Sequence, residues 1–87
     1  MLKLKPRTTY LNGDGDQVMI AGLAECEKIE GETIFYSIQG HWYSESGLFV
    51  VSYRDGLRSL CDRGSRHNIV SEDTSPAAVE WWDGVDT

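Results

Sequence analysis

The stretch Thr33–Arg54, TIFYSIQGHWYSESGLFVVSYR, decides the fold of this chain. It holds six of the nine aromatic residues and two apolar runs, which are separated by glycine-containing turns. Its β-branched and aromatic side chains suit a pleated, half-buried surface. We therefore predict the centre of a β-sheet here, with strands over residues 33–39, 42–44 and 48–54.

Further strands are predicted on both sides of this centre, over residues 7–11, 17–24, 57–61 and 67–72. The sequence Asn-Gly-Asp-Gly-Asp at 12–16 joins the first two as a hairpin, because these residue types tolerate positive φ. Turn signals recur every ~8–12 residues, which is typical of an all-β barrel or sandwich. We predict a mainly all-β fold, a small SH3-like antiparallel barrel of about five to seven short strands over residues 1–72.

Alternation along the strands predicts which side chains share a face. Ile34, Tyr36 and Ile38 would lie on one face of their strand and Phe35 on the other. Most of the aromatic centre would then form barrel interior. Trp42 and Tyr43, beside the Gly40 turn, are the rings we expect to be exposed there, so they are candidate partner-binding residues.

Residues 73–87 form an acidic, Trp-containing extension. Ser75 can cap a helix and Pro76 suits its first position, which predicts a short helix over 77–83 that Gly84 closes.

Two adjacent tryptophans, Trp81 and Trp82, lie on this predicted helix. Their side chains would point about 100° apart, so one short helix cannot easily bury both rings on a small barrel. Tryptophan is common in binding hot spots, and the acidic neighbours Glu80 and Asp83 would suit a basic groove on a partner protein. The alternative is that one ring covers an open end of the barrel while the other packs beside it.

The charge and cysteine content exclude several classes of function. A formal charge of −6 disfavours non-specific adhesion to nucleic acid or to anionic membranes. No apolar run approaches the roughly 18–20 residues that span a bilayer, and the start of the chain lacks the hydrophobic segment of a signal peptide. With only two cysteines, reduced thiols and a cytoplasmic location are expected, with no membrane partner.

Residues 12–16 have the spacing of a calcium loop, with ligand types at Asn12, Asp14 and Asp16. The sixth position of such a loop needs glycine and the twelfth needs glutamate, but these positions hold Gln17 and Leu23. A hairpin turn is the better interpretation.

Four residues have the right types for zinc binding or for Cys/His catalysis, namely Cys26, His41, Cys61 and His67. No pair among them has the spacing of a chelating knuckle, and nothing local marks a lowered thiol pKa. We predict no catalytic residues, no metal and no cofactor, and we expect that the protein is not an enzyme.

An alternative hypothesis is nucleic-acid binding through a basic cluster, Arg54, Arg58, Arg63 and Arg66. Small barrels with exposed aromatic residues bind nucleic acid in this way, although Asp55 and Asp62 dilute the cluster. A second alternative is a structural or assembly protein that forms a homo-oligomer.

Residues 37–43 (SIQGHWY), the Ser46-Gly47 pair and residues 67–72 (HNIVSE) resemble short β-rich proteins of tailed bacteriophages and prophages. Those proteins show a Gly-x-Trp-Tyr segment and a later apolar-Val-x-Glu ending. The resemblance covers residues 7–72 and gives no counterpart for the extension. It implies a bacterial cytoplasm, an accessory role in phage biology and no catalytic residues. The leading hypothesis is a non-enzymatic module that binds a host or phage protein.

Overall fold

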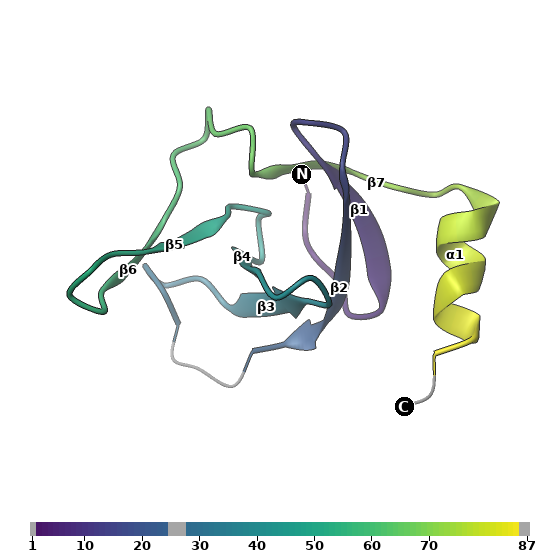
Figure 1. The fold of residues 1–87 in the computed structure, drawn as a ribbon, viewed down its shortest axis with the longest axis horizontal. Helices are drawn as coiled ribbons and strands as arrows, with labels where there is room; N and C mark the ends of the chain where they lie inside the picture. Colours follow the sequence, from purple (N-terminus) through teal and green to yellow (C-terminus); the bar gives the residue numbers. More distant parts are fainter. Residues whose placement is uncertain (1, 25–27, 86–87) are drawn as a thin grey trace.

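The computed structural model describes residues 2–24 and 28–85, and this part of the chain forms seven short strands followed by one helix (Figure 1). The elements are β1 (Thr8–Asn12), β2 (Gln17–Leu23), β3 (Ile34–Ser37), β4 (Trp42–Ser44), β5 (Val50–Ser52), β6 (Arg58–Leu60), β7 (Ile69–Glu72) and α1 (Pro76–Asp83). The prediction of a mainly β fold with a short C-terminal helix is confirmed. Within the described residues, no helix has the length and apolar character needed to cross a membrane.

Five strands form one antiparallel sheet in the order β4-β3-β2-β1-β7, and this sheet curls into a half-barrel (Figure 1). The register shifts between Ile20 and Gly22 and again between Leu11 and Asn12. Such irregularities bend a strand and increase its twist, which favours the curl. β5 and β6 form a separate hairpin, which the isolated bridge between Tyr43 and Phe49 links to β4.

The loop after β4 brings distant parts of the chain together. The Ile69 N–H donates to the Gly47 carbonyl at 2.8 Å, and the Leu4 N–H donates to the Glu45 carbonyl at 2.8 Å. Gly47 has φ 94°, and a Cβ at this position would lie 3.0 Å from Leu2 Cδ2 and 3.1 Å from the Ile69 oxygen. Only glycine fits both the backbone conformation and the space. The predicted bend at 46–47 therefore joins the loop to β7.

The turn at 12–16 is a hairpin, as predicted. The Asn12 Oδ1 accepts hydrogen bonds from the N–H groups of Asp14 (2.9 Å) and Asp16 (3.0 Å), so this oxygen stabilises the turn. The Gly13 N–H donates to the Arg66 carbonyl at 2.9 Å, and a Cβ on Gly13 would lie 2.8 Å from that oxygen. The hairpin is therefore held against the loop 61–68.

One buried amide fixes the same loop to β5. The side chain of Asn68 is buried, its Oδ1 accepts from the Phe49 N–H at 2.8 Å, and its Nδ2 donates to the Asp62 carbonyl at 2.6 Å. The Asn68 carbonyl also accepts from the Gly13 N–H at 3.1 Å. One residue thus links the loop, the hairpin turn and the strand that begins at Val50.

The core lies inside the curled sheet and consists of Leu4, Tyr10, Val18, Ile20, Phe35, Tyr43 and Ile69. In β3 the inward face carries Phe35 and Ser37, whereas Tyr36 is 41% exposed and the following Ile38 is 48% exposed. Ile34 is also buried, at the start of β3. The aromatic centre therefore divides between the core and an outer face, instead of forming mostly interior.

Candidate partner-binding surfaces

Trp82 anchors α1 to the outside of the sheet. Its ring is 6% exposed, and its Nε1–H donates to Thr9 Oγ1 at 3.0 Å. Arg7 Nη2 donates to the Trp82 carbonyl at 2.6 Å, and the Arg7 guanidinium carbon lies 5.8 Å from the centre of the indole ring. The Trp82 ring is therefore occupied by contacts within the chain.

The local sequence fixes where α1 begins. Ser75 Oγ accepts a hydrogen bond from the Ala78 N–H at 3.4 Å, Pro76 occupies the first turn, and Gly84 follows the last helical residue. These caps were predicted from the sequence and they are confirmed. They set the phase of the helix, so that Ala78 and Trp82 point inward together.

Trp81 is the exposed partner of the anchored ring. It is 43% exposed and packs edge-to-face on Trp82, with 4.8 Å between ring centroids and 86° between ring planes. A cavity of about 240 Å³ lies beside it, lined by Thr9, Gln17 and Met19 of the sheet and by Ala77, Ala78 and Trp81 of the helix. The expectation that one short helix leaves one of the two rings outside is confirmed.

The solvent-facing side of α1 combines apolar and acidic groups. Val79 is 56% exposed, and Glu80 and Asp83 are both exposed on the same helix as Trp81. The helix contains no basic residue. We call the set Val79, Glu80, Trp81 and Asp83 the helix face.

Tyr43 does not lie on the surface, and the expectation that it is exposed is wrong. It is 3% exposed, lies opposite Phe35 in the pairing of β3 with β4, and its burial raises the pKa of the phenol to about 12. Successive side chains of a strand point to opposite faces, so Trp42 and Tyr43 cannot both point outward. Trp42 is the outward one, opposite Tyr36 and half-buried.

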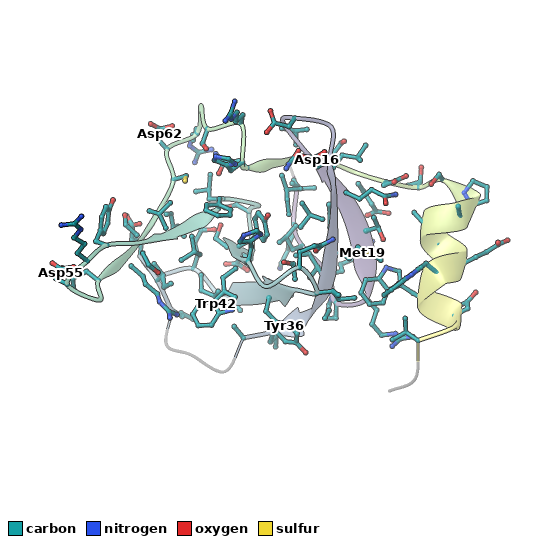
Figure 2. All side chains as sticks on the ribbon, viewed as in Figure 1. Asp16, Met19, Tyr36, Trp42, Asp55 and Asp62 are labelled. Carbon is teal, nitrogen blue, oxygen red and sulfur yellow. The ribbon has the colours of Figure 1, made fainter. Side chains whose placement is uncertain are left out.

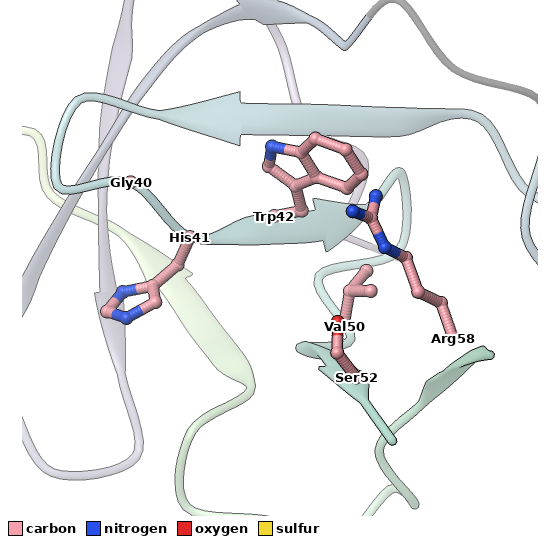
Figure 3. Close-up of a pocket in the computed structure, with 6 residues that line it drawn as sticks. All are labelled: Gly40, His41, Trp42, Val50, Ser52 and Arg58. Atoms are coloured by element: carbon pink, nitrogen blue, oxygen red, sulfur yellow. The ribbon is translucent and has the colours of Figure 1, made fainter. Parts of the chain in front are cut away.

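Trp42 is half-buried because an arginine from another strand covers it. The Arg58 guanidinium carbon lies 3.9 Å from the centre of the Trp42 ring, a close cation–π contact. Figure 3 shows Arg58 extending from β6 across a cleft toward Trp42 on β4. This cleft has a volume of about 310 Å³ and is lined by Gly40, His41, Trp42, Val50, Ser52 and Arg58.

The four arginines of the predicted basic cluster lie on two segments, Arg54 and Arg58 on the β5–β6 hairpin and Arg63 and Arg66 in the loop 61–68. Arg58 lies over Trp42, and Arg66 faces Asp14 with 3.8 Å between Nε and Oδ2. Asp55 follows Arg54 at the tip of the β5–β6 hairpin, and Asp62 precedes Arg63 in the separate loop 61–68. Figure 2 shows these two aspartates. Arg58 and Arg66 therefore each have a side-chain contact within the chain.

The imidazole rings of His41 and His67 both pack against the ring of Phe49. Their ring centroids are 5.4 and 5.3 Å from the Phe49 centroid. Cys61 is a half-buried free thiol, and Cys26 lies outside the described residues. In the described parts of the chain, no three His, Cys, Asp or Glu side chains are arranged to hold a metal ion.

Sequence reasoning missed the contact of Arg58 with Trp42 and the outward direction of Tyr36. The apolar run of β3 gives no sign of its inner face, because neighbouring positions on both faces are apolar. Arg58 comes from a different sheet from Trp42, so no local pattern connects the two.

No protein-family model matches the chain, and no curated protein and no solved structure matches it significantly.

Proposed function

We propose that the protein is a non-enzymatic protein-binding module that presents the helix face to a basic surface of a host or phage protein. The observation that carries this proposal is the contrast between the two adjacent tryptophans. Trp82 anchors α1, and Trp81 stays 43% exposed on the same rigid element.

Anchoring gives Trp81 the properties of a binding hot spot. An isolated helix of eight residues is marginal in water, so the contacts of Trp82 supply the order of α1. A ring held in place loses little conformational entropy on binding, and tryptophan is enriched among the residues that dominate interface energies.

Charge defines the kind of partner. Glu80 and Asp83 are exposed on the same helix as Trp81, this helix has no basic residue, and the chain has a net charge of −6. A complementary partner carries lysine or arginine around an apolar pocket, and salt should slow its association. The resemblance to phage proteins favours a partner in a bacterial cytoplasm.

The test is site-directed photocrosslinking in a bacterial lysate. A photoreactive phenylalanine analogue placed at position 81 should give a discrete protein adduct that resists nuclease treatment. The matched control is position 70 on β7, where Val70 is 62% exposed, and it should not give this adduct. Charge reversal of Glu80 and Asp83 to lysine should reduce the yield of the adduct.

Other outcomes would redirect the proposal. Equal adducts from positions 81 and 70 would mean that the helix face has no special role. An adduct that disappears with nuclease would favour a nucleic-acid partner, and an adduct of the protein with itself would favour a homo-oligomer.

A further inference from the structure

The cleft lined by Trp42 and Arg58 lies at a defect in the pairing of two strands. β4 and β5 approach one another at the isolated bridge between Tyr43 and Phe49 and belong to different sheets beyond it. The cleft opens on the side where residues 40–42 and 50–52 separate, and residues from both segments line it. It is therefore a wedge between two diverging strand edges (Figure 3).

Backbone groups of β5 point into this wedge. In the hairpin with β6, the Tyr53 N–H donates to the Leu57 carbonyl and the Cys61 N–H donates to the Phe49 carbonyl. Hydrogen-bonded positions alternate along an antiparallel pair, so Val50 and Ser52 direct their backbone groups away from β6. Ser52 lies beyond the bridge to β4, so no described strand pairs with it on the side of the wedge.

The cleft also carries the positive charge of Arg58. Arg58 is directly opposite Ser52 in the β5–β6 register, and this places its side chain at the cleft. Among the described residues Arg58 forms no ion pair, and none of the six lining residues is acidic. The ring of Trp42 holds the guanidinium at 3.9 Å, which leaves its N–H donors available around the plane.

We propose that this cleft is a second binding site, which takes an extended peptide segment with a carboxylate side chain. The peptide backbone would pair with the free edge of β5 at Ser52, and its carboxylate would meet the guanidinium of Arg58. Strand addition to an exposed edge is a common mode of peptide recognition, in which main-chain hydrogen bonds give affinity and side-chain pockets give specificity. Arginine is well suited to a planar carboxylate because its donors form a fixed fork.

The cleft fits a peptide better than it fits nucleic acid. Arg58 is the one fixed cation among the lining residues, whereas nucleic-acid affinity depends on neutralising several phosphates. The chain as a whole carries a charge of −6, which opposes a polyanion. A single carboxylate on an otherwise neutral strand avoids most of that repulsion.

The experiment is a selection of random linear peptides of about twelve residues, displayed on phage, on the full-length protein. Enriched peptides should carry Asp or Glu among β-branched residues, and synthetic copies should bind in fluorescence anisotropy. Arg58→Ala should weaken binding about tenfold or more, and Arg58→Lys should fall between the two because it keeps the charge without the fork. Hydrogen exchange of the Ser52 amide should slow when the peptide binds.

Two matched variants separate this site from other surfaces. Arg54→Ala removes an arginine of the same hairpin that does not line the cleft, and it should leave binding unchanged. Trp81→Ala should also leave it unchanged, so that failure of this site and failure of the helix face are distinguishable. Circular dichroism checks that each variant is folded.

Several results would overturn the proposal. These are the absence of any enriched peptide, enrichment of peptides without acidic residues, and affinity that survives Arg58→Ala. Binding of a single-stranded oligonucleotide that Arg58→Ala abolishes would assign the cleft to nucleic acid. A concentration-dependent dimer that Arg58→Ala dissociates would assign it to a second copy of the chain.

Discussion

Replacing Trp82 with alanine should release α1 from the sheet, whereas replacing the adjacent Trp81 should leave the helix in place. The two residues have the same chemistry and neighbouring positions, so the comparison isolates the contacts that bury Trp82 on the sheet. Trp82 is 6% exposed and Trp81 is 43% exposed.

The structure sets the size of the difference. Trp82 buries more surface than Trp81 by roughly a third of a tryptophan side chain, or ~90 Å² of about 250 Å², which corresponds to ~2 kcal/mol of unfolding free energy. Trp82→Ala also removes the hydrogen bond to Thr9 Oγ1, which contributes about 1 kcal/mol. We therefore expect Trp82→Ala to cost about 3 kcal/mol more than Trp81→Ala, a difference in Tm of more than about 10 °C for a domain of this size.

Two measurements check this prediction. Urea unfolding gives the free energies of the two variants, and hydrogen exchange of the α1 amides reports whether the helix remains docked. Equal losses of stability in the two variants would refute the reasoning, as would helix amides that stay protected in Trp82→Ala.

Two further predictions concern the core and the loop after β4. Because burial raises the pKa of Tyr43 to about 12, the folded chain keeps a proton that the unfolded chain releases near pH 10. The neutral phenol therefore stabilises the fold fully below about pH 10, and this contribution is lost as the pH rises toward about 12. Tyr43→Phe should reduce the alkaline loss of unfolding free energy, measured in urea, by up to ~2 kcal/mol, and it should leave a residual slope from Tyr10, whose pKa burial also raises. Gly47→Ala should cost about 3 kcal/mol, because it combines positive φ with overlap against Ile69, whereas Gly15→Ala, with positive φ in open space, should cost about 1 kcal/mol; similar losses in urea unfolding would contradict the steric argument.

The strands and the helix were predictable because their signals are local. The asparagine and glycines of 12–16 favour a hairpin turn, and Ser75 with Pro76 favours a helix start. Each of these features depends on neighbours within a few residues. The structure places turns and caps where the sequence predicts them.

Burial within those elements was less predictable because it depends on distant residues. Helix geometry predicts that one of Trp81 and Trp82 stays outside, but Thr9 and Arg7 decide which one, through hydrogen bonds from the other end of the chain. The strand 42–44 has a similar ambiguity, because Trp42 and Tyr43 are both large and aromatic. The pairing of Tyr43 with Phe35 in the core resolves it.

The contacts that join β7 and Asn68 to earlier segments have a consequence for the order of folding. β1 gains its second neighbour from β7, and the backbone N–H groups of Gly13 and Phe49 donate hydrogen bonds to oxygens of Asn68. These pairings join segments that are distant in sequence, so closing the loops between them costs conformational entropy. We therefore expect them to form later and more slowly than the local β1–β2 and β3–β4 hairpins. During synthesis, β1 keeps an open edge until residues 69–72 have left the ribosome. We expect the nascent chain to be most vulnerable to misassembly in that interval, and the arrival of β7 to end it.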